Sequence, residues 1–518
     1  MTPAEIWILI GLFGVTIPLV ALARRADIPY PVVLVLGGLI LGFVPGLPSV
    51  QLDPNLVLLA FLPPLLYWEA VTAPTDVMRA NAGQIWTLAI GLVVVTTVTV
   101  ALVAHASIAN LAWPMAFVLG AIVAPTDELA ASPVLERLKM PRHLIAIVEG
   151  ESLLNDASAL ILYAAALGVA LGGAFSWSSS LVQFGLASVG GIVLGLLTGR
   201  LAVEGWRRID DTQLQGVISF ALPYLTYLTA LRLNLSGVLA VVFAGTYVNR
   251  FTPQVITPAS RLQAVGYWET LVFLVNSILF LLVGLQLHSV VASVAIEYPL
   301  QTIVWYALLV NLTVIATRFA YILLLELVPV LGRAAEHQEI DWSHAIIEAW
   351  SGLRGAVSLA AALAIPVTMT SGAPLAHRHL VIFLAFSVIL VTLVGGGLTL
   401  PLVVKRLGGE GDTREQDEDR RRGVAAMHQA ALAAIERLEG AGRISGEHAQ
   451  ALRRYYKRGA RGQYSAEARA EFDAEREVIE AERDALTELR ERREIDNTTL
   501  RRLQRILDLA EERLPPAR

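Results

Sequence analysis

An apolar run from Leu144 to Leu171 contains the stretch EGESLLND, residues 149–156. The run is long enough to cross a bilayer, which needs about 20 residues. Asp156 lies near its middle, too deep for its carboxylate to reach the membrane surface easily, and an Asp at the centre of a span costs about 2.5–3.5 kcal/mol on insertion scales. The apolar sequence resumes directly after Asp156, which disfavours a polar cap at a span end. An intramembrane carboxylate indicates a functional site.

Helical spacing divides this stretch into two faces. Ser152 and Asp156 are four residues apart and share one face, whereas Glu151 and Asn155 share a neighbouring face. A carboxylate beside a hydroxyl suits a hard cation or a proton. A buried carboxylate beside an amide needs a basic partner or hydrogen-bond donors, which another part of the chain has to supply.

The composition indicates a polytopic membrane protein. Of 518 residues, 55% are hydrophobic and 16% are charged, whereas a soluble protein carries about 25% charged residues. The lack of Cys excludes disulfides, thiolate metal sites and Cys nucleophiles. The first apolar run, Ile6 to Ala23, has no basic segment before it and no small-residue cleavage pattern after it, so we expect it to be a retained span.

Hydropathy predicts an all-α fold with about thirteen transmembrane helices. The expected spans are 5–23, 31–47, 55–73, 86–107, 113–131, 143–171, 180–203, 213–230, 236–249, 264–288, 299–327, 344–366 and 379–404. Basic residues such as Arg24, Arg137 and Lys405 gather in the loops after odd-numbered spans, and the positive-inside rule places these loops in the cytoplasm. We therefore expect a multi-pass protein of the cell membrane, with its N-terminus outside and its C-terminus in the cytoplasm.

Polar residues interrupt two of the expected spans. The fifth breaks at Ala124–Glu128 (APTDE), where Pro125 removes a backbone donor and clashes with the preceding turn. The twelfth breaks at Ser351–Gly355 (SGLRG). The two broken spans are seven apart in the chain. This spacing is expected if spans 1–6 and 8–13 form two inverted six-helix repeats, because the breaks then lie at matching positions. Broken helices at matching positions are the sequence pattern that best indicates a transporter site.

Three further charged residues lie in or near apolar spans. Arg318 lies well inside a run from Leu300 to Leu327, and we interpret it as the partner of Glu151; snorkelling to the nearer interface is the alternative. Arg354, in the second break, is the other candidate partner of Glu151. Glu69 either snorkels at the end of the third span or faces the site.

The character of the sequence changes after residue 406, because charges crowd into the remainder of the chain. We predict two domains: a transmembrane domain, residues 1–406, and a cytoplasmic tail of three or four short helices, residues 407–518. The tail contains no nucleotide-binding loop, metal cluster or catalytic motif. It either solubilises the protein, or it regulates the membrane domain or forms dimer contacts.

With these motifs in view, the chain resembles the bacterial sodium/proton antiporters of the NhaP type, in the monovalent cation:proton antiporter superfamily. The resemblance covers all thirteen expected spans and rests on four motifs in combination: Pro125-Thr126-Asp127, Gly150–Asp156, Leu62–Leu66 (LPPLL) and Gly352–Ser358 (GLRGAVS). It implies a secondary antiporter, not an enzyme, that exchanges Na+ for H+ in pH and sodium homeostasis and needs no cofactor. It also implies a homodimer in the lipid bilayer and no nucleic acid partner.

The resemblance implies two groups of site residues. Those that bind the cation and the protons would be Asp156, Asp127, Thr126, Ser152 and Glu69, with Na+ at the two aspartates. Those that support the site would be Glu151, Asn155, Arg318 and Arg354. Electrogenic relatives have a second acid where this chain has Asn155, which favours electroneutral exchange. One departure is Glu128, where the family usually has Pro.

Other functions stay open at the level of the sequence. The same fold could exchange K+ or Li+ for H+. A cation channel would need a pore lined by repeated rings, and no pore-loop signature is visible. An intramembrane aspartyl protease could use Asp127 and Asp156, but the Gly-x-Gly-Asp arrangement expected for that class is absent from the sequence.

Overall fold

The computed structural model describes residues 3–44, 59–129, 131–173, 177–331, 342–407, 414–459 and 466–492, together with 503, 504, 507, 509 and 510. The regular elements in these ranges are helices, apart from one isolated bridge between Thr368 and Pro374. The chain divides into two compact units, Met1–Asp412 and Thr413–Arg518. The division falls close to the expected domain boundary at residue 406, and the roles of the two domains stay predictions.

Seven helical stretches in the described ranges are long and apolar enough to cross a membrane. Two of them consist of consecutive helices joined by a π-helical turn. The seven are α6–η1–α7 (Ala82–Trp86, Thr87–Leu92 and Val93–Ser107), α10 (Arg142–Ala170), α11 (Trp177–Arg208), α12 (Thr212–Arg232), α14 (Pro258–Glu297), α15 (Leu300–Leu331) and α18–η2–α19 (Arg378–Leu390, Val391–Gly396 and Gly397–Leu407).

The other expected spans also contain helices. These are α1 (Pro3–Ala26), α2 (Tyr30–Gly42), α4 (Leu62–Thr72), α8 (Trp113–Val123), α13 (Gly237–Val255), α16 (Trp342–Trp350) and α17 (Ala356–Leu363), with the short helices α5 (Thr75–Ala80) and α9 (Ser132–Arg137) between spans. The all-helical membrane fold is therefore confirmed. The count of thirteen crossings stays a prediction.

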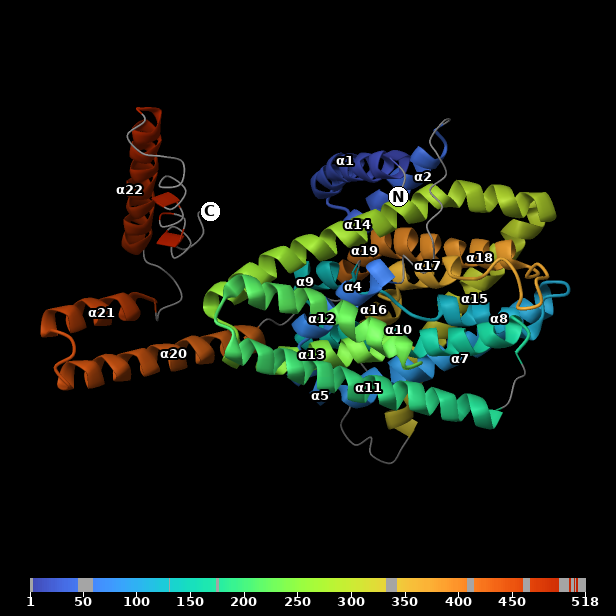
Figure 1. Cartoon of the computed structure of the whole chain (residues 1–518), viewed down its shortest axis with the longest axis horizontal. Helices are drawn as coiled ribbons and strands as arrows, with labels where there is room; N and C mark the ends of the chain where they lie inside the picture. The colour runs from blue at the N-terminus through green and yellow to red at the C-terminus, as the bar shows by residue number, and fades with distance from the viewer. Residues whose placement is uncertain are drawn as a thin grey trace. The chain divides into compact units, whose positions relative to one another are not determined.

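Helices α2 and α14 pack closely along one another (Figure 1). Gly284 permits this approach, because a Cβ at that position would lie 2.0 Å from the carbonyl oxygen of Val35. Small residues allow such close approach of helices inside a bilayer. At 40 residues, α14 is longer than the expected span 264–288, since it begins in a polar segment after the cap residue Thr257, whose Oγ1 accepts from the backbone N–H of Ser260.

Two large groups of buried apolar side chains lie in the first unit. The first group joins α2, α7, α8, α10, α14, α15, α17 and α18, and the second joins α4, α10, α11, α12, α13 and α14. Apolar side chains on the outer faces, such as Leu186 on α11 and Leu312 on α15, are exposed, as lipid-facing residues would be. Helix α10 contributes to both groups: Leu144 and Val148 belong to the first, and Leu153 and Ala157 to the second.

Both expected interruptions are present. Helix α8 ends at Val123 and α9 begins at Ser132, while α16 ends at Trp350 and α17 begins at Ala356. The two non-helical segments touch, because the backbone N–H of Asp127 donates to the carbonyl oxygen of Leu353 at 2.7 Å. Their meeting point positions the site described below.

The second unit contains α20 (Arg414–Gly440), α21 (Gly446–Gly459) and α22 (Ala466–Glu491). Helices α20 and α21 pack against each other. Arg453 Nη2 donates to Glu439 Oε2 at 2.5 Å, and Ile435 and Ala449 are buried.

Candidate functional site

A small cavity of about 20 Å³ lies where α4, α10, α17 and the non-helical segment after α8 meet. A cavity needs roughly 10–15 Å³ to hold one water molecule, so this one has room for a single water or ion. Its polar lining residues are Glu69, Thr126, Asp127, Ser152, Asp156 and Ser358. It therefore brings together the five residues that the family resemblance implied for cation and proton binding, and adds Ser358, which was not predicted.

Helix α10 contributes one carboxylate and one hydroxyl to the cavity. Asp156 is 7% exposed and Ser152 is 5% exposed, and both line the cavity. Their four-residue spacing had predicted that they share one face of the helix. The Ser152 hydroxyl donates to the carbonyl oxygen of Thr126 at 3.1 Å, so the Ser152 oxygen keeps its lone pairs as possible ligands.

The second aspartate is held by the interrupted segments. Asp127 Oδ1 accepts from the backbone N–H of Leu129 at 2.8 Å, which fixes the turn after α8. Asp127 Oδ2 lies against Gly355, where an added Cβ would be only 1.5 Å from that oxygen. Gly355 thus provides the space that the carboxylate occupies. The sequence showed the glycine in the second break but not which side chain it accommodates.

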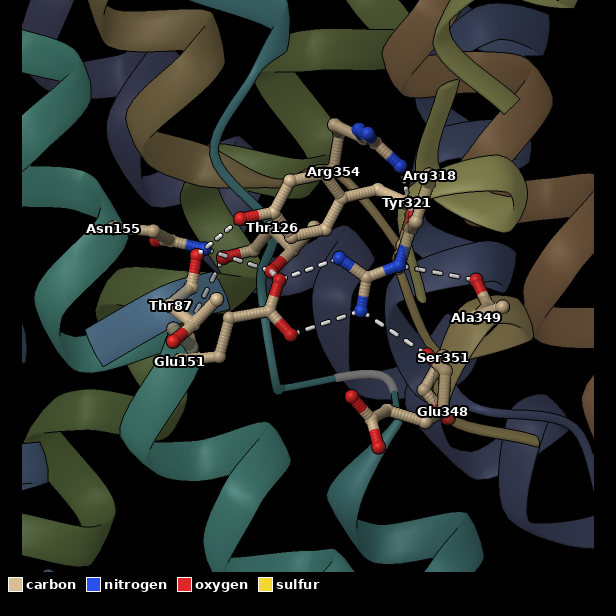
Figure 2. Close-up of polar contacts among 12 residues, drawn as sticks. Thr87, Thr126, Glu151, Asn155, Arg318, Tyr321, Glu348, Ala349, Ser351 and Arg354 are labelled. Carbon is tan, nitrogen blue, oxygen red and sulfur yellow. Dashed lines mark hydrogen bonds and ion pairs between the residues drawn. The ribbon is translucent and has the colours of Figure 1, made fainter. Parts of the chain in front are cut away.

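Glu151 and Arg318 form a buried salt bridge with two hydrogen bonds (Figure 2). Arg318 Nη1 donates to Oε1 at 2.5 Å and Nη2 donates to Oε2 at 2.9 Å, and each side chain is 2% exposed. Arg318 Nε and Nη2 also donate to the carbonyl oxygens of Ala349 and Glu348, both at 3.1 Å. The arginine therefore satisfies carbonyl groups at the C-terminal end of α16, where a positive charge is favourable.

Thr126 connects this salt bridge to the cavity (Figure 2). Its hydroxyl donates to Glu151 Oε1 at 3.0 Å and accepts from Asn155 Nδ2 at 2.8 Å. The face of α10 that carries Glu151 and Asn155 thus holds a residue that lines the cavity.

Arg354 has a different set of partners from Arg318. Its Nε donates to the carbonyl oxygen of Val123 at 3.2 Å, its Nη1 donates to that of Gly352, and its backbone N–H donates to Thr392 Oγ1. It therefore satisfies a carbonyl at the end of α8. Of the two candidate partners for Glu151, the structure places Arg318 in contact with it.

Glu128, the departure from the family pattern, lies beside the cavity and does not line it. Its carbonyl oxygen accepts from the backbone N–H groups of Ala131 and Ser132 at 2.9 and 2.8 Å, in the turn that leads into α9. Its Oε2 is buried and has no hydrogen-bond partner among the described residues.

One buried carboxyl group near the site was not predicted. Glu348 on α16 is 3% exposed, and its Oε2 accepts from Gln84 Nε2 at 3.0 Å. An acidic residue inside the twelfth expected span was the signal that the sequence offered.

The described residues contain no group of three His, Cys, Asp or Glu side chains arranged to hold a metal ion. The cavity nevertheless combines carboxylate, hydroxyl and carbonyl oxygens, which are ligands that hard cations accept.

Comparison with known proteins places this chain in a family. The family model for the transmembrane domain of sodium/hydrogen exchangers matches residues 10–406. An uncharacterised Na+/H+ exchanger of Mycobacterium tuberculosis is 35% identical over 98% of this chain and 96% of its own length. The Na+/H+ antiporter ApNhaP of Aphanothece halophytica is 31% identical over 75% of this chain and 72% of its own length.

A solved structure and a further relative extend the comparison. The fold is similar to that of the sodium proton antiporter MjNhaP1 from Methanocaldococcus jannaschii, with a TM-score of 0.62, 21% identity, and coverage of 79% of this chain and 99% of the other. A relative from Bacillus pumilus, named a sodium, potassium, lithium and rubidium/H+ antiporter, is 31% identical over 76% of this chain and 61% of its own length. Because the family model matches most of this chain, the chain belongs to the sodium/hydrogen exchanger family.

Proposed function

We propose that this protein is a secondary antiporter that exchanges Na+ for H+ across the cell membrane and has no enzymatic activity. The observation that carries the proposal is a small cavity at the meeting point of two interrupted segments, lined by Asp127 and Asp156. Interrupted helices are where transporters place substrate and coupling-ion sites.

The mechanism follows from the electrostatics of two carboxylates in one cavity. Two ionised carboxylates repel each other, and burial disfavours charge, so the empty, fully ionised cavity is the least favourable form. A cation or protons at the same oxygens relieve this cost, and the two therefore compete for the site. If only the cation-loaded or the protonated form changes the side to which the cavity opens, exchange is obligatory.

The proposed supporting roles use the contacts around Thr126. The salt bridge with Arg318 holds the Glu151 carboxylate in place, and this carboxylate accepts a hydrogen bond from the Thr126 hydroxyl. Asn155 holds the same hydroxyl by donating a hydrogen bond to its oxygen. Glu69 contributes to the site through water, and Arg354 stabilises the end of α8.

The cation and the stoichiometry are proposed on separate grounds. The names of the relatives favour Na+, and the name of the Bacillus pumilus relative favours a second candidate, a broader selectivity that includes K+ and Li+. An amide at Asn155, in place of a second acid, favours electroneutral exchange of one cation for one proton.

The topology and the assembly complete the proposal. The one-sided distribution of basic loop residues supports an outside N-terminus and a cytoplasmic C-terminus. We propose a homodimer in the lipid bilayer, with a tail that regulates transport.

Purified protein in sealed vesicles with a pH-sensitive dye tests the function. Addition of Na+ should drive proton movement that is unchanged when the membrane potential is clamped, and the same assay with Li+, K+ and Rb+ gives the selectivity. Cation flux without proton movement would indicate a channel. The absence of any cation-driven proton movement would contradict the proposal.

A further inference from the structure

Glu348 occupies an unusual position for an acidic side chain. It is 3% exposed, it lies on α16 just before the second interruption, and its Oε1 is buried with no hydrogen-bond partner among the described residues. Its Oε2 accepts one hydrogen bond, from the neutral amide of Gln84 on α6. Figure 2 shows the carboxyl group beside the bridge between Glu151 and Arg318.

The charged groups that face Glu348 come from two elements. Glu151 lies on α10, and Arg318 and Glu326 lie on α15, all within electrostatic reach of the Glu348 carboxyl group. Helix α6 contributes the uncharged Gln84. Arg318 thus lies within electrostatic reach of two buried carboxyl groups, those of Glu151 and Glu348.

Arg318 is committed to Glu151 in this structure. Four of its five N–H donors bond to the two oxygens of Glu151 and to the carbonyl oxygens of Ala349 and Glu348. An ionised Glu348 would therefore be a buried carboxylate with only an amide donor, which is far less favourable than the neutral acid. The geometry is that of a Glu348 that holds a proton.

We propose that Glu348 is a positioning residue that exchanges a proton and thereby controls how firmly Arg318 holds Glu151. Arg318 Nη2 bonds to the backbone carbonyl oxygen of Glu348 at 3.1 Å, and Arg318 also lies within electrostatic reach of the Glu348 side chain. An ionised Glu348 carboxylate would therefore compete with Glu151 for the guanidinium. A change in how firmly Arg318 holds Glu151 would affect the cavity, because Glu151 accepts a hydrogen bond from the hydroxyl of Thr126, and Thr126 lines the cavity. The inference rests on the proposed function, since its readout is cation transport.

Two substitutions separate this role from a purely structural one. Glu348→Gln keeps the size and still accepts from Gln84, but it imitates the protonated acid permanently. Gln84→Leu removes the donor that favours the ionised form of Glu348, so it biases the acid toward its neutral form. Both variants should therefore change transport in the same direction. If Glu348 merely completed a hydrogen bond, Glu348→Gln would leave transport unchanged at every pH. Gln84→Leu would then lower the stability of the protein without changing the pH dependence of transport.

The experiment measures the cation KM and the maximal rate from acid to alkaline pH, with the full-length protein in sealed vesicles. At acid pH, wild type and both variants should have the same KM. At alkaline pH, the KM of both variants should differ from that of wild type in the same direction, by about 2- to 30-fold. Glu204→Gln, which neutralises a partly exposed acid on α11 paired with Arg208, is the matched control and should follow wild type.

The outcomes are distinguishable. A wild-type KM at every pH in a folded Glu348→Gln variant would overturn the inference while the proposed function stands. If that variant fails to fold, Gln84→Leu decides alone, and a wild-type pH profile there overturns the inference. A wild-type protein that shows no cation-driven proton movement would overturn the proposed function instead.

Discussion

The backbone N–H of Asp127 donates to the carbonyl oxygen of Leu353 at 2.7 Å, and this bond joins the two interrupted segments. Two residues further on, Gly355 lies against the carboxylate of the same aspartate. Residues of the second interrupted segment therefore contact both the backbone and the carboxylate of Asp127 in the first, so the position of Asp127 depends on both segments.

Substitution of Gly355 by Ala should displace the Asp127 carboxylate. The added Cβ would meet Oδ2 at 1.5 Å, and a displacement of about 1 Å at a reacting group costs about 100-fold in rate. We expect a loss of cation-driven proton movement of this order in a protein that still inserts and folds. Gly395→Ala is the control, because no described atom beyond its own stretch of helix lies within 4 Å of a Cβ there. Equal activity in the two variants would contradict the placement of Asp127.

Asp127→Asn should weaken cation binding severely. The amide keeps the shape of the side chain and can still accept from the backbone of Leu129, but it carries no charge for the cation. The residual activity should show a raised KM and an altered pH profile in the vesicle assay. A wild-type KM would mean that Asp127 is not a cation ligand.

The salt bridge between Glu151 and Arg318 should behave as a structural unit. Removal of one partner leaves the other as an unpaired buried charge, at a cost of about 3–5 kcal/mol. Glu151→Gln and Arg318→Gln should each lower the temperature of thermal unfolding in detergent, and the double variant should recover part of the loss.

A double-mutant cycle measures this coupling. The cycle with Arg354 in place of Arg318 is the control, because Arg354 bonds to the carbonyl oxygens of Val123 and Gly352. Strong coupling in the first cycle and additive losses in the second are expected. The reverse result would mean that the two arginines are assigned to the wrong partners.

The tail should modulate transport and not perform it. The residues that line the cavity all lie within the first unit, whereas α20–α22 belong to the second. A protein truncated after Arg406 should still insert and exchange cations, with a shifted pH dependence or a less stable dimer. Complete loss of transport from a well-folded truncation would make the tail part of the transport machinery.

Much of the fold was predictable because a bilayer restricts the choice of structure. Backbone groups inside a membrane have to be satisfied within a segment, so apolar stretches of sufficient length form helices. The interruptions were also predictable, since Pro125 removes a backbone donor and glycines cluster at Ser351–Gly355. The polar first turns of α14 were not, because hydropathy does not show how far a helix extends beyond the membrane.

The site was predictable where local spacing decides it. The four-residue spacing places Ser152 with Asp156 and Glu151 with Asn155 on any helix. Contacts between distant segments were harder. Arg318 could be inferred because a buried Glu requires a cation, but Glu348 and its contact with Gln84 join α16 to α6, and sequence spacing does not show which neutral donors meet across helices.

Asp156→Asn in sealed vesicles tests the central claim most directly. The carboxylate lines the cavity at the middle of α10, and the amide keeps its size but neither carries a charge nor releases a proton. The account predicts Na+-driven proton movement in the wild-type protein and none in an inserted, folded variant. Substantial Na+-driven proton movement in the variant would contradict the account, because exchange would then proceed without Asp156.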